Sequence, residues 1–202
     1  MVANTHVEIS RANEGGFSLF ELLIAMTITL AVMVAASTLL ASSLRTRTRE
    51  NLRSEALAAA QRSLSIMSRE IGNSGYGLTD NGIISADSSA TSIRVRANLN
   101  NDSDVDDIDE DVRFVYQAGN TEIVRYDDST SVSQRSVLAT KITSLTIRYL
   151  DTAGTAVAAG SAERISIEVL VDLPAGPEQP AGEVRLISQV ALRNAPTTLQ
   201  QF

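Results

Sequence analysis

The sequence contains no cysteine and no tryptophan, and His6 is its only histidine. Without cysteine the chain can form neither a disulfide framework nor a thiolate metal site. Histidine is the commonest general base and a frequent metal ligand, so a single histidine near the N-terminus leaves little basis for acid–base catalysis or transition-metal chemistry. GxSxG, Gly-rich phosphate-binding and HExxH motifs are also absent. We therefore expect a protein that is not an enzyme.

Basic residues are outnumbered by acidic ones. The 17 Lys and Arg residues, among which Lys141 is the only lysine, stand against 24 Asp and Glu residues, for a net charge of −7. An acidic surface repels the phosphate backbone of nucleic acids, so we do not expect nucleic acid as a partner. The basic stretch Arg45–Arg53 is the one candidate surface for binding DNA. We favour its packing against neighbouring helices or lipid headgroups.

One long apolar run, residues 17–44, carries a single charge, Glu21. About 20 apolar residues in a helix suffice to cross the hydrocarbon core of a bilayer. The apolar part of a cleaved secretory signal is shorter, about 7–15 residues. We therefore predict a transmembrane helix over residues 17–44. An ionised carboxylate inside a bilayer costs about 2.5–3.5 kcal/mol, so Glu21 either has a partner or lies near the water interface.

The helix is predicted to continue through residues 45–72, because no proline interrupts it and Gly72 stands at a C-cap position. This second half is amphipathic. Its apolar stripe, with one residue every three or four positions, comprises Leu52, Ala56, Ala60, Leu64, Met67 and Ile71. A pair of helices that breaks near Ser42–Ser43 is the alternative.

After residue 72 the pattern changes to short runs of β-branched residues with period-two alternation. Strands are predicted at 91–97, 112–117, 122–126, 142–150, 164–171 and 183–192. Asn120 marks a hairpin turn, and the proline-rich loop LPAGPEQPAG joins the last two strands. The predicted fold class is therefore α+β, with a long N-terminal helix packed on a mostly antiparallel β-sheet domain over residues 73–202.

The segment GGFSLFELLIAM resembles the N-terminal processing signature of type IV prepilins and pseudopilins. In that family a prepilin peptidase cuts after a glycine, the new N-terminal residue is usually phenylalanine, and glutamate is the fifth residue of the mature chain. Gly16, Phe17 and Glu21 match these positions. The resemblance implies that residues 1–16 are a cleaved leader and that Phe17 becomes N-methylated. It also implies that Glu21 pairs with the methylated amine of a neighbouring subunit during assembly.

Two further segments are similar to PilW-type minor pilins: LSIMSREIGNSGYGL at the end of the helix and SQVALRNAP in the last strand. The resemblance implies a type IV pilin fold and a minor pilin that primes or caps a pilus. Its partners would be other minor and major pilins, the prepilin peptidase, the inner-membrane assembly platform and a tip adhesin. It would cross the inner membrane once, carry a periplasmic domain and enter a pilus at the cell surface.

Two alternatives to this interpretation are a minor pseudopilin of a type II secretion system and a membrane-anchored calcium-binding module outside any filament. The charge pattern also departs from the family, because the leader is nearly neutral rather than basic. Arginines follow the apolar run instead, at Arg45, Arg47, Arg49 and Arg53. The positive-inside rule would favour the opposite orientation. We follow the processing motif, because the peptidase acts on the cytoplasmic face.

The acidic stretch NLNNDSDVDDID, residues 98–109, has the spacing of an EF-hand-type calcium loop. Oxygen-bearing side chains fall at loop positions 1, 3, 5, 7, 9 and 12. The candidate ligands are Asn98, Asn100, Asp102, Asp104, Asp106 and Asp109. The loop departs from the pattern in having asparagine at its first position and Ser103 where a glycine is usual. We predict a calcium site, and a solvated acidic loop is the alternative.

Overall fold

The computed structural model describes residues 16, 18–102, 104–130, 132–173, 175 and 181–195. Residues 1–15 of the predicted leader, Phe17 and most of the proline-rich loop lie outside the described residues. By its contacts the chain divides into two units, Met1–Arg45 and Thr46–Phe202.

The helix α1 (Leu19–Gly72) begins in the first unit and passes through Ser42–Ser43 without a break. The carbonyl of Ser18 accepts hydrogen bonds from the backbone N–H groups of Glu21 at 3.0 Å and Leu22 at 3.1 Å, which makes Ser18 the N-cap. Serine at the N-cap and glutamate three residues later have the spacing of a capping box. The start of the helix is therefore encoded by residues of the segment GGFSLFELLIAM.

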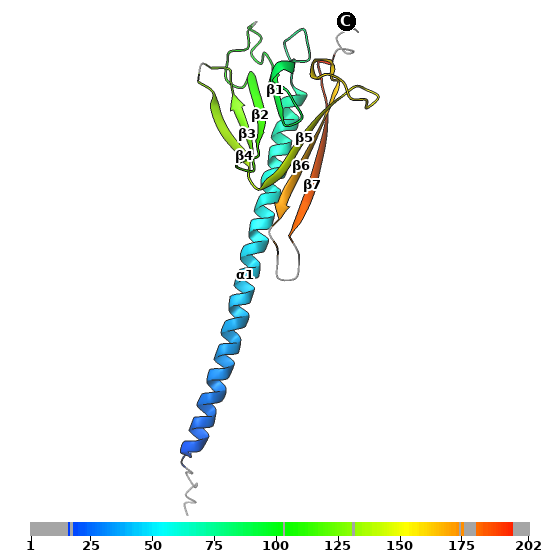
Figure 1. Cartoon of the computed structure of the whole chain (residues 1–202). Helices are drawn as coiled ribbons and strands as arrows, with labels where there is room; N and C mark the ends of the chain where they lie inside the picture. The colour runs from blue at the N-terminus through cyan, green and yellow to red at the C-terminus, as the bar shows by residue number, and fades with distance from the viewer. Residues whose placement is uncertain are drawn as a thin grey trace, which may run out of the picture. The chain divides into compact units, whose positions relative to one another are not determined.

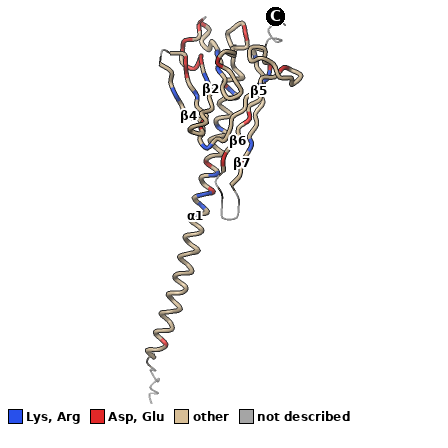
Figure 2. The backbone as a smooth tube through the Cα atoms, viewed as in Figure 1, with Lys and Arg blue, Asp and Glu red and all other residues tan. Residues whose placement is uncertain are grey.

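The first part of α1 exposes an apolar surface that is long enough to cross a membrane, judged by length and composition. In Figure 2 this part of the tube is tan almost throughout, in keeping with the single charge, Glu21, that the sequence places among residues 17–44. Its hydroxyl groups donate to carbonyls three or four residues earlier in the helix, as for Thr27, Thr29 and Ser37. Polar side chains that are satisfied within the helix leave its surface compatible with lipid.

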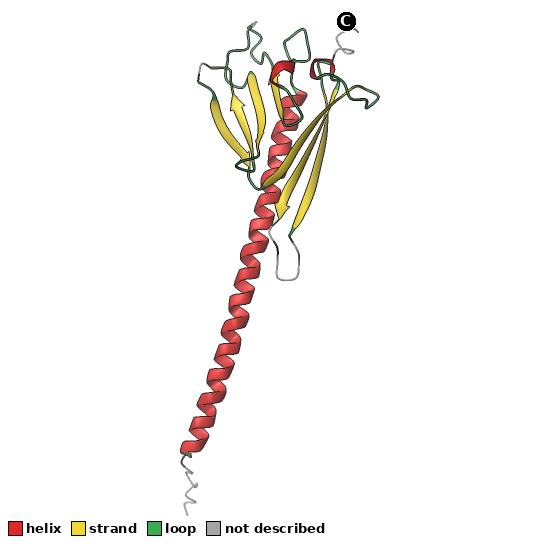
Figure 3. Ribbon diagram, viewed as in Figure 1, coloured by secondary structure: helices red, strands yellow, loops and turns green. Residues whose placement is uncertain are grey.

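In the second unit, α1 packs on antiparallel strands, as the sequence predicts (Figure 3). The predicted stripe is buried at Ala56, Ala60, Leu64, Met67 and Ile71. Leu52 differs, with 39% of its surface exposed. The strands thus cover the last turns of the helix but leave the start of the stripe open.

The strands form two antiparallel sheets rather than one (Figure 1). The first has the order β1-β2-β3-β4 and the second the order β5-β6-β7. Their bounds are β1 (Ser92–Arg96), β2 (Asp111–Gln117), β3 (Glu122–Asp127), β4 (Gln134–Ala139), β5 (Ile142–Leu150), β6 (Arg164–Leu173) and β7 (Gly182–Ala191). Two short 3-10 helices, η1 (Ser85–Asp87) and η2 (Ala159–Ser161), lie in the connections. Both sheets contribute to the hydrophobic core that buries the helix stripe.

The sequence does not predict β4. Its residues are mostly exposed, and it lies at the edge of its sheet, where one buried face is not required. The alternation that marks the other strands is therefore missing. The hairpin predicted at Asn120 is confirmed, since the backbone N–H of Asn120 donates to the carbonyl of Gln117 at 3.2 Å between β2 and β3.

The helix ends at Gly72, as predicted, and the chain leaves it through a turn that contains two further glycines. Gly75 and Gly77 in this turn have positive φ, +76° and +71°, whereas Gly72 does not. A Cβ at Gly75 would lie 2.4 Å from the carbonyl oxygen of Asp80. Gly72 instead lets the helix approach β7, because a Cβ there would lie 3.2 Å from Val190 Cγ1. Gly75 therefore permits the turn and Gly72 the packing.

The same turn is tied to the residues that follow β7. The side-chain amide of Asn194 donates to the carbonyls of Gly75 at 2.6 Å, Leu78 at 3.0 Å and Asp80 at 2.6 Å. These contacts join two segments that lie far apart in the sequence, LSIMSREIGNSGYGL and SQVALRNAP.

Candidate functional site

The first candidate site is the N-terminal segment around Gly16 and Glu21. Gly16 is exposed, and a Cβ placed on it would meet no atom within 4 Å. Glu21 lies exposed in the first turn of α1, and among the described residues it forms no ion pair. The N-terminus of a helix carries a partial positive charge, which favours an acidic side chain there. Phe17, the third predicted residue of this site, lies outside the described residues.

The residues around the start of α1 are exposed, and Gly16 lies three residues before the helix. The large apolar side chains that follow are exposed, as for Leu19, Phe20 and Met26. An uncovered apolar surface of this size needs lipid or another protein to cover it.

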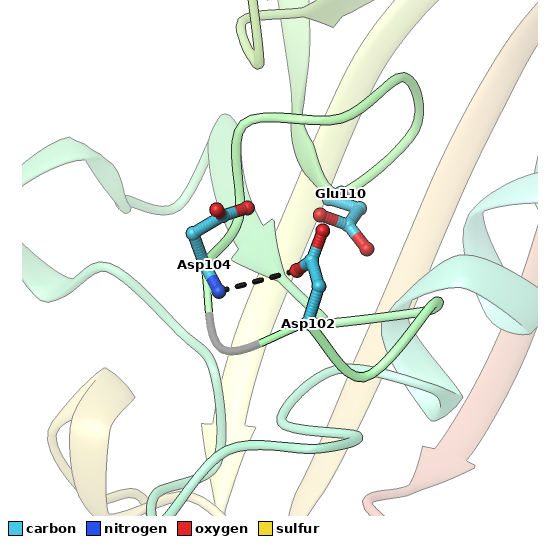
Figure 4. Close-up of side chains that lie close together, drawn as sticks. All are labelled: Asp102, Asp104 and Glu110. Atoms are coloured by element: carbon cyan, nitrogen blue, oxygen red, sulfur yellow. Dashed lines mark hydrogen bonds between the residues drawn. The ribbon is translucent and has the colours of Figure 1, made fainter.

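The second candidate site is the loop between β1 and β2, which contains the predicted calcium ligands. Carboxylate oxygens of Asp102, Asp104 and Glu110 all lie within 4.8 Å of one another (Figure 4). Asp102 and Asp104 are exposed, whereas Glu110 is only 1% exposed. The structure thus brings two of the six predicted ligands together with one residue that the prediction omits.

The other predicted ligands have different roles in the structure. The Asn98 side-chain oxygen accepts the backbone N–H of Asp102 at 3.2 Å. The Asn100 amide donates to Asp102 at 2.7 Å and to Asp107 at 2.6 Å. Asp109 is not part of the group, because its carboxylate accepts a hydrogen bond from Arg125 at 2.5 Å. Asp106 lies near enough to Asp104 to raise the pKa of that carboxyl group.

Glu110 is the residue that sequence reasoning missed. Its carboxylate accepts backbone N–H groups from Leu99 at 2.5 Å, Asn100 at 3.3 Å and Asp107 at 3.4 Å, so it holds the loop together from inside. The only signal in the sequence is that it follows Asp109, the last position of the calcium-loop spacing. Sequence spacing alone cannot identify a ligand that is displaced by one position, because the backbone of this loop is irregular.

The carboxylates of this loop influence one another. The hydrogen bond with Asp106, together with desolvation and the charge of Asp102, raises the pKa of Asp104 to about 6. The amide of Asn100 and the backbone of Asp104 lower the pKa of Asp102. Calcium takes six to eight oxygen ligands, so the three carboxylates would need backbone carbonyls or water to complete a site. The calcium site stays a prediction.

Comparison with protein families matches residues 11–37 to the family described as the prokaryotic N-terminal methylation motif. Comparison with curated proteins gives no match. The matched residues include Gly16, Phe17 and Glu21, and the family is structural rather than catalytic. The exposed apolar helix that begins within this motif is consistent with a membrane-anchored protein. The N-terminal motif therefore supports a type IV pilin-like protein, either a pilin or a pseudopilin.

Proposed function

We propose that the protein is a minor pilin of the PilW type, a non-catalytic subunit that primes or caps a type IV pilus. The observation that carries this proposal is the methylation motif at residues 11–37, at the start of a helix with an exposed apolar surface. A prepilin peptidase removes residues 1–16 and methylates Phe17. The apolar half of α1 waits in the inner membrane, with residues 46–202 in the periplasm, until the assembly platform transfers the subunit to the filament.

In the filament, the apolar half of α1 contacts other minor and major pilins, which replace the lipid around it. Glu21 pairs with the methylated amine of a neighbouring subunit, which neutralises a carboxylate in an apolar environment. The pairing sets the axial position of each incoming subunit. A tip adhesin is a further partner of a subunit in this position.

The first test is the N-terminal sequence and intact mass of the protein purified from its native membrane. We expect a mature chain that begins at N-methylated Phe17. An intact N-terminus at Met1, in cells with an active prepilin peptidase, would refute the pilin interpretation. It would favour the membrane-anchored module outside any filament.

The second test is assembly of the Glu21→Ala variant. We expect correct cleavage but a loss of filament incorporation, measured by immunoblotting of sheared filaments. Glu50→Ala is the matched control, because it removes the same charge from an exposed position of α1 outside the apolar run. Equal incorporation of both variants would contradict the role of Glu21.

A minor pseudopilin of a type II secretion system shares the same motif. Deletion of the gene separates the two functions, because loss of a minor pilin reduces surface pili and loss of a pseudopilin blocks export of secreted enzymes. Intact piliation together with defective export would favour the pseudopilin.

The convergence of Asp102, Asp104 and Glu110 favours an added calcium-binding role for the β1–β2 loop. Calcium bound only to the folded state would stabilise it by about 2.7 kcal/mol at a hundred times its dissociation constant. Thermal denaturation with calcium or a chelator tests this role. We expect the double variant Asp102→Asn/Asp104→Asn to lose the calcium response and the exposed-site control Asp172→Asn to keep it. A wild-type protein that does not respond to calcium would exclude the role.

A further inference from the structure

A cavity of about 190 Å³ lies in the second unit, where the last turn of α1 meets β1 and the start of β2. Its lining residues from α1 and the following turn are Arg69, Glu70, Asn73 and Ser74. The strands contribute Val95, Ala97 and Val112, all buried, to its apolar wall. Pockets for drug-sized ligands measure roughly 300–1,000 Å³, so this cavity fits a group of the size of one side chain.

Ser74 brings an unpartnered polar atom to this cavity. It is 1% exposed, and among the described residues its hydroxyl oxygen has no hydrogen-bond partner. Buried polar groups are nearly always hydrogen bonded in native proteins. A ligand that carries a hydrogen-bond donor into the cavity would supply the missing partner.

The charges around the cavity favour a cation. Two arginines and three carboxylates line it, which leaves a net charge of −1. Arg96 is already engaged, since its Nε lies 2.7 Å from Asp111. Glu70 and Asp109 share a single guanidinium, that of Arg125, at 2.9 and 2.5 Å.

Glu70 lacks full compensation for its charge. Its nearest other cation is Arg69, at 3.9 Å, and the Arg69 side chain is largely exposed. Burial raises the pKa of Glu70 even though its hydrogen bond with Arg125 works in the opposite direction. A positive group inside the cavity would favour the ionised form of this carboxylate.

We propose that this cavity binds the charged head of an arginine or lysine side chain presented by a neighbouring filament subunit. The head donates to Ser74 Oγ and neutralises Glu70, and the aliphatic stem packs on Val95, Ala97 and Val112. Long basic side chains commonly bury their stems in this way. Only the source of the side chain rests on the proposed function, while the binding chemistry stands independently of it.

The experiment is an isotope-labelled NMR titration of the full chain in detergent micelles. The probe is the blocked tripeptide Ala-Arg-Ala, and a tripeptide with citrulline in place of arginine is its uncharged control. A chelator is present throughout, because a divalent ion at Glu110 would cancel the negative charge of the cavity. We expect saturable shifts at the backbone amides of Ser74 and Ala97 with the arginine peptide alone.

Variants test the two groups assigned to the ligand. We expect Glu70→Gln to weaken binding about five- to tenfold, as the loss of one nearby charge does. Ser74→Ala should weaken it about two- to fivefold through the lost hydrogen bond. Glu183→Gln is the matched control, because it makes the same change at an exposed position of β7 and should leave the affinity unchanged. The amide spectrum of each variant reports whether it is folded.

Three results would overturn the proposal. One is the absence of saturable shifts in a folded wild-type chain, and another is equal binding of the citrulline peptide. The third is binding of free agmatine but not of the arginine tripeptide, which would assign the cavity to a small cation rather than to a subunit. A chain that binds the peptide but keeps its leader in cells would contradict the proposed function and leave the cavity chemistry intact.

Discussion

Replacement of Asn194 by alanine tests whether the residues after β7 hold the turn at the end of α1. The Asn194 amide nitrogen contacts three carbonyls, but it carries only two hydrogens. Each hydrogen bond contributes about 0.5–1.5 kcal/mol net. We therefore expect a loss of about 1–3 kcal/mol in the free energy of unfolding.

The loss should also appear as a lower melting temperature. A change of 1 kcal/mol shifts the midpoint by about 2–4 °C in a unit of roughly 150–250 residues, the size class of Thr46–Phe202. The expected shift is therefore about 2–12 °C. The assay is chemical and thermal denaturation of the full chain in detergent, followed by near-ultraviolet circular dichroism of the tyrosines.

Two further variants test whether the loss comes from the hydrogen bonds of the Asn194 amide. Asn194→Asp keeps the shape of the side chain but directs a carboxylate at the same carbonyls, so we expect at least as large a loss as for alanine. Asn51→Ala makes the same chemical change at an exposed position of α1 and should have little effect. A loss for Asn194→Ala within about 0.5 kcal/mol, the usual range for surface substitutions, would refute the reasoning.

Three further predictions concern the same unit. Gly75→Ala should destabilise the protein by more than about 1 kcal/mol, because positive φ strains the new residue and its Cβ would meet the Asp80 carbonyl; a thermal midpoint equal to wild type would contradict this. Phe114→Ala, at a side chain with 0% exposure, should cost about 3–5 kcal/mol in urea denaturation, and a loss below 1 kcal/mol would argue against a close-packed core around it. Burial acts to raise the pKa of Asp128, but its bonds with Arg113 and Ser133 outweigh burial and lower the pKa. The stabilisation from Asp128 is therefore present above about pH 3.9 and lost as the pH falls through the folded-state pKa. Asp128→Asn should therefore destabilise the protein near neutral pH, and the stabilities of the variant and the wild type should converge in acid.

Sequence patterns of short range predicted most of the elements. The apolar run and its continuation as a stripe define α1, because a helix repeats every 3.6 residues and buries one face. Alternation defines β5, whose predicted bounds match the observed ones, and locates five other strands to within a few residues. The N-terminal motif is equally local, since it is a run of consecutive residues, 11–37.

The acidic loop marks the limit of such patterns. Spacing alone assigned Asp109 to the cation group, whereas the fold places Arg125 of β3 beside Asp109 and turns Glu110 inward. The sequence of the loop does not predict the ion pair between Asp109 and Arg125, because Arg125 belongs to a strand outside the loop.

By itself, the sequence determined the long helix, its apolar half, the N-terminal motif and most strands, because each depends on residues that are neighbours along the chain. Only the tertiary structure decided the division into two sheets, the edge strand β4, the link between Asn194 and the Gly75 turn, and the cavity beside Ser74. Each of these depends on hydrogen bonds and charges between segments far apart in sequence. Those contacts are fixed only when the sheets close around the helix and bury a common core.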